Sequence, residues 1–432
     1  MNFVAPCKKT TSSSFLLFPL FYLFEFVSDF GFRISDFGLC VSALTVSLSF
    51  FLASHARAAE AVAPSALHIS LSSPLDFQIV QRSSRSNGKL TIAGTIEPES
   101  KNLPLPDKLE ARVTGKSSSG DLPGQWQALP CDPRVAAFRG KLVLPAGGWY
   151  RLELRASRQG TNVASVVVEH VGLGEIFVIA GQSNSANYGE EKQKTQTGLV
   201  AAFDGTTWQL ASDPEPGAGG KKGSFIPAFG DEIAQHFQVP VGLVAMGIGS
   251  TSVREWLPAG TRLSGLPTIT RNVVTVGEGQ WEPLGAIFEK LTARMKQLGS
   301  NGFRAVLWHQ GESDGRQADP GRSLSGELYR QDLEQLIHES REAIGWQAPW
   351  FVAQVSYHNP SEVGWPDTRA AQKAVWSDGL ALPGPDTDTL TGDMREKNGT
   401  GVHMSAKGLK AHAHLWFEKV TPWLDQQLKV AP

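Results

Sequence analysis

Cysteine is scarce in this chain of 432 residues, which contains only Cys7, Cys40 and Cys131. Two of the three lie in an N-terminal segment that we expect to be removed, so the mature chain would keep one cysteine. A single thiol can form neither an internal disulfide nor a thiolate metal site. The sequence therefore excludes a disulfide framework and a cysteine-ligated metal from the expected mature protein.

An excess of charge of either sign is also lacking. The chain has 40 basic and 42 acidic residues and a formal net charge of -2. Nucleic-acid-binding proteins and proteins that bind anionic membranes carry concentrated positive charge. We therefore expect no nucleic-acid partner, and a neutral or weakly charged partner instead.

Residues 1–58 are expected to be a leader that contains a signal peptide. They include two apolar runs, 15–27 and 39–53, and the second is followed by Ala56 and Ala58 in the A-x-A form of a signal-peptidase site. The second run is short for a membrane-spanning helix and suits a signal peptide. Cleavage would export the protein to the periplasm or outside the cell without stable membrane insertion, and a membrane anchor is the alternative.

Residues 59–172 are expected to form a β-sandwich accessory domain. Short runs with alternating apolar and polar residues follow one another between about residues 66 and 170, separated by Gly, Pro, Asn and Ser clusters. This rhythm is typical of an all-β sandwich. No titratable residues gather in it, so the prediction is structural support, with sugar binding as the alternative.

Residues 173–429 show a different rhythm, in which strands alternate with helices. The expected strands are 175–180, 239–246, 303–309 and 349–358, and the expected helices are 283–298 and 326–344. Leu284, Ile287, Phe288, Leu291 and Met295 would share one face of the first helix. The pattern predicts an α/β fold with a flavodoxin-like, doubly wound parallel sheet, whose ligands bind beyond the carboxyl ends of the strands.

The loops after these strands carry reactive side chains. Ser183 stands in "GQSN" after the first strand, "GIGSTSVREW" follows the second, "HQGESD" ends the third, and "GTGVHMSAKG" precedes the last helix. Ester hydrolysis by a serine needs a hydroxyl nucleophile, a base, an orienting carboxylate and donors for the oxyanion. One serine after one strand would indicate only a turn, whereas the four loops together indicate a hydrolase.

These four blocks, in this order, resemble the SGNH hydrolases, and among them the sialate O-acetylesterase and carbohydrate esterase family 6 (acetylxylan esterase-like) group. The resemblance extends from residue 172 to about residue 424. It implies that Ser183 is the nucleophile and His403 the base. It also implies that the backbone amides of Ser183 and Gly249 and the side chain of Gln310 donate to the oxyanion.

The position of the acid in the expected triad departs from the usual spacing. Many SGNH hydrolases place an Asp three residues before the His, but Thr400 occupies that position here. The resemblance to the acetylxylan esterase branch implies Glu312 instead. Asp393 is the alternative acid, a dyad oriented by a carbonyl is the third possibility, and Asp314 would fix its loop or bind substrate.

Other residues compete for these roles or extend them. His309 and His358 are rival bases, and Ser185 is the next serine to consider. His412 and His414 lie two residues apart, so they point to different sides of a helix and are expected to be surface histidines.

Two side chains in the second loop are candidates for the sugar. Arg254 could pair with a substrate carboxylate, as in sialic acid, or with a carboxylate of the protein, whereas Trp256 could stack on a neutral sugar such as xylan.

The expected function is that of an exported carbohydrate acetylesterase, which removes O-acetyl groups from sugars through an acyl-enzyme without metal or cofactor. A non-catalytic carbohydrate-binding protein and a lipase or thioesterase are the alternatives. The sequence leaves both the sugar and the oligomeric state open.

Overall fold

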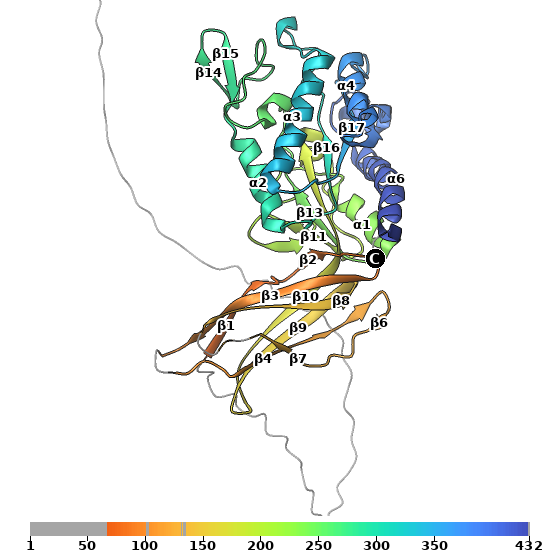
Figure 1. Ribbon diagram of the computed structural model, residues 1–432. Coiled ribbons are helices and arrows are strands. Elements are labelled where there is room, and N and C mark those ends of the chain that lie inside the picture. The colour runs from red at the N-terminus through yellow and green to blue at the C-terminus, as the bar shows by residue number, and fades with distance from the viewer. Residues whose placement is uncertain (1–66, 101–102, 131, 133–134, 431–432) are drawn as a thin grey trace, which may run out of the picture. The chain divides into compact units, whose positions relative to one another are not determined.

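The computed structural model of the protein describes residues 67–100, 103–130, 132 and 135–430 (Figure 1). The predicted leader and its cleavage site lie outside the described residues. Within the described ranges, no helix has the length and hydropathy needed to cross a membrane.

The N-terminal region is built from two layers of antiparallel strands (Figure 1). One layer is a three-stranded sheet in the order β1 (Leu67–Ser73), β3 (Asn87–Pro98) and β8 (Ala137–Pro145). The other contains β4 (Lys108–Thr114), β5 (Lys116–Ser117), β6 (Gly120–Asp121), β7 (Gln127–Leu129) and β9 (Gly147–Arg158). Alternate residues of both layers, such as Leu90 and Ile92 on β3 and Leu152 and Leu154 on β9, share one hydrophobic core.

A single long strand, β10 (Thr161–Gly181), belongs to both regions of the described chain. Its first half pairs with β9, and residues 171–174 also pair with β2 (Gln78–Gln81). Its last residues pair in parallel with β13 (Val241–Ala245) on one side and with β16 (Ala305–His309) on the other. The predicted boundary at residue 172 therefore falls inside a continuous strand.

The parallel strands follow the order β11, β13, β10, β16, β17 and β18, with β12 antiparallel at one edge. Their bounds are β11 (Val200–Phe203), β12 (Trp208–Leu210), β13 (Val241–Ala245), β16 (Ala305–His309), β17 (Trp350–Gln354) and β18 (Leu382–Asp386). The α/β prediction is confirmed at this level. The sheet is mixed, because β10 also carries the antiparallel strands, so the all-parallel sheet with a separate sandwich is not confirmed.

Helices cover both faces of the parallel strands. Val178 and Val306 face a core shared with α2 (Ala286–Leu298), α3 (Gly326–Ile344) and α4 (Pro366–Ser377). Phe177 and Leu307, one position away, face a core shared with α1 (Ile226–Phe237) and α6 (Ala406–Val430). Strands covered on both faces need the near-continuous apolar runs that the sequence contains.

The predicted central strands and the two predicted helices are present, but some residues differ from prediction. Leu284 is 50% exposed and precedes α2, because the hairpin of β14 (Val273–Gly277) and β15 (Gln280–Pro283) ends just before it. Ile287, Leu291 and Met295 do face the core. The helix face was therefore predicted correctly except at its first residue.

Candidate active site

Three strand ends place their loops next to one another. The parallel pairing of β10 and β13 continues past the strands, since the Met246 amide donates to the Ile179 carbonyl (2.8 Å) and the Ile248 amide to the Gly181 carbonyl (2.9 Å). On the other side, the Gln182 amide donates to the His309 carbonyl (3.0 Å). The loops after β10, β13 and β16 therefore leave the same edge of the sheet.

Ser183 begins a short 3-10 helix, η1 (Ser183–Ser185), directly after β10. The residue is 6% exposed, so Ser183 lies in a buried turn. Neither its hydroxyl nor its amide makes a hydrogen bond within the described residues. The rival Ser185 differs, because its hydroxyl donates to the Gln182 carbonyl (2.7 Å) and it is fully buried.

His403 has a carboxylate partner that the sequence analysis missed. Its Nδ1 lies 2.8 Å from Oε1 of Glu396, seven residues earlier. The Glu396 amide also donates to the His403 carbonyl (2.9 Å), which closes a tight loop between the two residues. Within that loop Lys397 and Asn398 both have φ of 55°, the left-handed conformation that an Asn-Gly turn favours.

The predicted acids occupy other places. Asp393 lies at the surface, where it binds Lys407 (2.7 Å) and keeps 72% of its side chain exposed. Glu312 is buried and accepts a hydrogen bond from the side chain of Asn184 (2.9 Å). The prediction that one of these two carboxylates contacts Nδ1 of His403 is therefore wrong in this structure, because Glu396 occupies that position.

The environment of His403 suits a neutral base. Burial lowers the pKa of His403, and the charge and hydrogen bond of Glu396 raise it in part. A carboxylate at Nδ1 fixes the tautomer in which Nδ1 carries the proton. Nε2 is then the free basic nitrogen.

Asn184 connects three of the predicted loops. Its Nδ2 donates to Glu312 after β16 and to the Val402 carbonyl (3.3 Å) beside His403. Burial raises the pKa of Glu312 to about 7, and its Oε2 has no hydrogen-bond partner within the described residues. Ser183, next to Asn184, is thereby brought to the loop that carries His403.

The loop before His403 is held by a buried arginine. Arg395 is 1% exposed, and its guanidinium donates to the carbonyls of Thr387 (2.9 Å), Leu390 (2.5 Å) and Val402 (2.7 Å). These bonds fix the chain on both sides of Glu396. The carboxylate therefore projects from a rigid segment rather than from a mobile loop.

Tyr188 lies between His403 and the glycine loop after β13. Its ring stacks on the imidazole with a centroid distance of 5.4 Å and an interplanar angle of 25°. A Cβ atom at Gly249 would lie 2.5 Å from Cζ of Tyr188, so only glycine fits there. The Gly249 amide makes no hydrogen bond within the described chain, whereas its carbonyl accepts one from Arg271 (2.8 Å).

Gln310 and Asp314 form a buried network instead of facing a ligand. Nε2 of Gln310 donates to the Thr251 carbonyl (2.9 Å), to Oε1 of Gln182 (3.2 Å) and to Asp314. Asp314 also accepts from Ser252 (2.5 Å), which anchors the loop after β13. Both N–H groups of Gln310 are engaged in this geometry, so its side chain is not free to donate to an oxyanion. Asp314 follows the alternative in which it fixes its loop rather than binds substrate.

Arg254 and Trp256 lie in a second 3-10 helix, η2 (Val253–Trp256), and both are buried. Nε of Arg254 binds Asp332 on α3 at 3.0 Å, the alternative in which it pairs with a protein carboxylate. Trp256 packs edge-on against Trp308. Neither side chain is available to a sugar, which corrects the prediction that they contact substrate.

The remaining histidines are not placed as rival bases. His309 is fully buried with Nε2 2.8 Å from the Thr387 hydroxyl, and burial lowers its pKa to about 3. His358 is half-buried and contacts the Glu312 carbonyl. His414 is exposed as predicted, but His412 is fully buried beside His309, so its surface placement is wrong.

Sequence reasoning could have reached some of the missed residues. The Asn-Gly pair at 398–399 lies between Glu396 and His403 and is a strong signal for a tight turn that folds the chain back. A turn there brings Glu396 towards His403. No comparable signal connects Tyr188 with His403, because that contact depends on how two distant loops pack.

Three solved structures resemble the chain weakly. A carbohydrate acetylesterase from Xanthomonas citri is 16% identical, with 81% of this chain and 74% of that chain covered and a TM-score of 0.47. A protein from Arabidopsis thaliana is 18% identical over 58% of this chain and 98% of its own, at 0.40. A carbohydrate esterase family 2 enzyme plus carbohydrate binding domain, from Corynascus thermopiles (Myceliophthora fergusii), is 11% identical over 83% and 99%, at 0.34.

All three TM-scores lie below 0.5, so these likenesses do not decide the family. No curated protein matches the chain. The sequence profile of the family described as carbohydrate esterase, sialic acid-specific acetylesterase matches residues 173–420, more than half of the chain and the whole segment that carries the site described above. The chain therefore belongs to this carbohydrate esterase family.

Proposed function

We propose that this carbohydrate esterase removes O-acetyl groups from sugars through an acyl-enzyme formed on Ser183. The observation that carries the proposal is the His403–Glu396 pair, with Nδ1 and Oε1 2.8 Å apart, on a loop that Asn184 joins to the Ser183 turn. A serine, a tautomer-fixed imidazole and a carboxylate are the parts that acyl transfer requires.

In the proposed mechanism, Nε2 of His403 takes the proton of the Ser183 hydroxyl while Oγ attacks the acetyl carbonyl. The tetrahedral intermediate collapses, the sugar oxygen takes the proton from His403, and the sugar leaves. A water molecule then attacks the acetyl-serine with the same proton transfers and releases acetate. Glu396 stabilises the imidazolium that forms in each half of the reaction.

We assign the oxyanion to two backbone amides, those of Ser183 and Gly249. Both amides lack a partner within the described residues, and both follow the point where the Ile248 amide pairs with the Gly181 carbonyl. Donors that need not reorient stabilise a developing negative charge effectively. Gln310 has no part in this assignment, because its side chain is engaged elsewhere.

The finer fold and the location belong to the same proposal. Strands β13, β10, β16, β17 and β18 lie in that order, which corresponds to the flavodoxin-like order 2-1-3-4-5 and supports an SGNH-type core with β11 and β12 added at one edge. We also propose that the leader directs export, because its second apolar run, 39–53, is followed by an A-x-A site of the signal-peptidase form.

The substrate proposed is an O-acetylated sialic acid, because the matching family is described as sialic acid-specific. Acetylated xylan is the second candidate. Acetate release from both substrates by one protein preparation distinguishes them, and faster release from xylan would overturn the choice of sugar while leaving the esterase mechanism intact.

The test of the mechanism is hydrolysis of p-nitrophenyl acetate. Ser183→Ala should lower kcat by roughly 10^4-fold or more and should prevent labelling by a serine-directed organophosphonate. Ser185→Ala is the matched control, from the same 3-10 helix, and should keep turnover within about tenfold of the parent.

Three results would contradict the proposal. Turnover within about tenfold of the parent in Ser183→Ala would assign the nucleophile to another residue. An inactive parent protein that still binds sugars would identify a non-catalytic carbohydrate-binding protein. Faster turnover of octanoyl than of acetyl esters would identify a lipase or thioesterase.

A further inference from the structure

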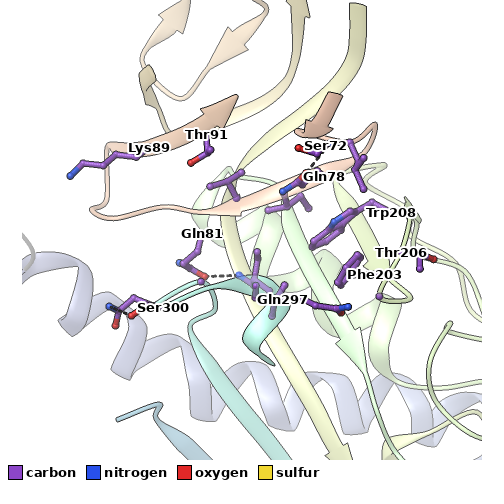
Figure 2. Close-up of a pocket in the computed structure, with 18 residues that line it drawn as sticks. Ser72, Gln78, Gln81, Lys89, Thr91, Phe203, Thr206, Trp208, Gln297 and Ser300 are labelled. Carbon is purple, nitrogen blue, oxygen red and sulfur yellow. Dashed lines mark hydrogen bonds between the residues drawn. The ribbon is translucent and has the colours of Figure 1, made fainter. Parts of the chain in front are cut away.

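Two pockets lie where the N-terminal strands meet the parallel strands, far from the catalytic loops. One has a volume of about 410 Å³ (Figure 2) and the other about 710 Å³. They share Gln81, Lys89, Ser300 and Asn301 in their walls, so they are adjacent, and we call the two together the junction groove. Ile176 lines it at the amino end of the parallel part of β10, and Gly181 at the catalytic edge lies five residues further, roughly 16 Å away.

The charged residues of the junction groove are all basic. Lys89, Arg82 and Arg304 line it, and neither pocket has an Asp or Glu in its wall. Glu175, buried beneath, binds both arginines at 2.6 Å and neutralises only one positive charge. Arg82 is 2% exposed and its Nη2 has no hydrogen-bond partner within the described residues. The groove therefore keeps a positive excess that an anionic ligand would balance.

The groove also offers unused hydrogen-bonding groups. The side chains of Lys89, Thr91 and Gln297 make no hydrogen bond within the described part of the chain. Figure 2 shows Lys89 and Thr91 on one side of the smaller pocket, with Trp208 and Phe203 on the other. Ligands rich in hydroxyl groups need several such donors and acceptors at once.

Aromatic rings complete the walls. In the smaller pocket, Trp208 and Phe203 stack on each other with centroids 4.9 Å apart and are buried, so they form an apolar wall rather than a free stacking face. Trp346 and Trp423 line the larger pocket and are only half-buried. A large flat ring beside polar groups suits the apolar face of a sugar ring. Trp346 and Trp423 in the larger pocket therefore offer the accessible ring surface for stacking.

We propose that the junction groove is a second glycan-binding site, separate from the catalytic site, which takes a sugar that carries a carboxylate. Lys89 and the arginine pair recognise the carboxylate, the free polar side chains bind hydroxyl groups, and the half-buried Trp346 and Trp423 stack on the rings. Sialic acids and uronic acids share this chemistry. Binding here does not depend on the proposed ester hydrolysis.

The experiment is a calorimetric titration of the Ser183→Ala protein, which cannot turn over a substrate. The ligands are 3′-sialyllactose and trigalacturonate, with lactose as the uncharged counterpart. We expect at least one acidic ligand to bind and lactose to bind at least about tenfold more weakly. Adding Lys89→Glu should weaken the acidic ligand at least about tenfold, because it reverses the charge of an exposed side chain in both pockets.

Lys141→Glu is the matched control. Lys141 is exposed on β8, paired with Thr91 of β3, and lies outside both pocket walls. It should leave binding unchanged. In the background with Ser183 intact, Lys89→Glu should leave p-nitrophenyl acetate turnover unchanged, which separates this site from the catalytic one.

The other possible results of the titration either support or overturn the proposal. Binding of only one acidic ligand would support the site and identify the source of the carboxylate. Equal binding of lactose, equal weakening by Lys89→Glu and Lys141→Glu, or no effect of Lys89→Glu would overturn the proposal. An inactive parent enzyme would refute the proposed function but would not affect the titration.

Discussion

At the scale of single residues, the acid of the proposed triad separates this chain from the spacing found in many SGNH hydrolases. Thr400 occupies the usual acid position, and its hydroxyl donates to the Lys397 carbonyl (2.9 Å) without contacting His403. Glu396 reaches the same nitrogen from four residues further back. In the proposed triad, a glutamate on a tight turn therefore takes the place of the aspartate that many SGNH hydrolases have three residues before the histidine.

We predict that Glu396→Gln lowers kcat on p-nitrophenyl acetate by roughly 10^3- to 10^4-fold, because an amide can neither stabilise the imidazolium nor hold the tautomer. Glu312→Gln and Asp393→Asn should each retain at least about a tenth of parental kcat. The glutamine at position 312 can still accept from Asn184, and Asp393 lies at the surface.

Circular dichroism of the three variants provides the folding control for this comparison. Loss of activity in Glu312→Gln with Glu396→Gln nearly unaffected would restore the original prediction that the QGE glutamate is the acid. Equal mild losses in all three would support a dyad of Ser183 and His403.

The pH profile offers an independent test of the same residue pair. A base must be neutral, so kcat/KM should rise with pH through the pKa of free-enzyme His403, which burial holds below its usual 6.5. Because Glu396 raises that pKa in part, Glu396→Gln should shift the midpoint to lower pH as well as lower the plateau.

A purely structural role for Glu396 would lower the plateau and leave the midpoint in place. A midpoint that moved to higher pH would contradict the assignment, since removing a neighbouring negative charge cannot favour the imidazolium.

At the scale of elements, the loop from Glu396 to His403 is the component most sensitive to small changes. A Cβ atom at Gly401 would lie 2.3 Å from Cγ of Glu396 and 3.0 Å from Oε1. Gly401→Ala should therefore displace the carboxylate and lower kcat by roughly 10- to 100-fold, with little change in KM for a small acetyl ester.

Thr400→Ala is the control from the same loop, because Thr400 is exposed and has an ordinary φ of -99°. It should keep near-parental kcat. A similar loss in both variants would indicate that the whole loop unfolds, rather than that one carboxylate moves.

Elements differ in how far the sequence predicts them. Strands β13, β16 and β17 follow from apolar runs, since both of their faces are covered. β18 reads "LPGPD", with two prolines and a glycine, and β11 is only four residues long, so neither has a usable pattern. Their places are set by pairing with neighbours that the sequence does not reveal.

The residues of the candidate site also differ in how far the sequence predicts them. Ser183, Gly249 and His403 follow from motifs in loops after strands, and those motifs depend on local sequence. Whether Arg254 faces a ligand or Asp332 depends on how α3 packs, and the engagement of Gln310 depends on Asp314 and Thr251. The partners of these side chains depend on tertiary packing, which short motifs do not encode.

At the scale of the whole molecule, the two regions are joined by more than a linker. Glu175 of β10 is fully buried and binds Arg82, which follows β2, and Arg304, which precedes β16. The Arg82 amide also donates to the Gly174 carbonyl (2.8 Å). A buried carboxylate that loses a partner costs about 3–5 kcal/mol.

We predict that a protein shortened to residues 173–432 is insoluble or unfolded, although it contains every residue assigned to catalysis. The cut divides β10, removes β2 and β9 from its side, and leaves Glu175 without Arg82. Solubility and circular dichroism of the shortened and full proteins provide the comparison. A soluble, cooperatively folded fragment with esterase activity would contradict the prediction.

The continuity of β10 also bears on how such an enzyme can be inherited or engineered. A catalytic region that shares a strand with its neighbour cannot be moved into another polypeptide as a cassette, because no point between the two regions can be cut without breaking a hydrogen-bonded ladder. Recombination would have to exchange the two regions as a pair. The N-terminal strands are in this sense part of the hydrolase, and libraries that vary substrate preference should keep the segment from β1 to β10 intact and diversify the catalytic loops instead.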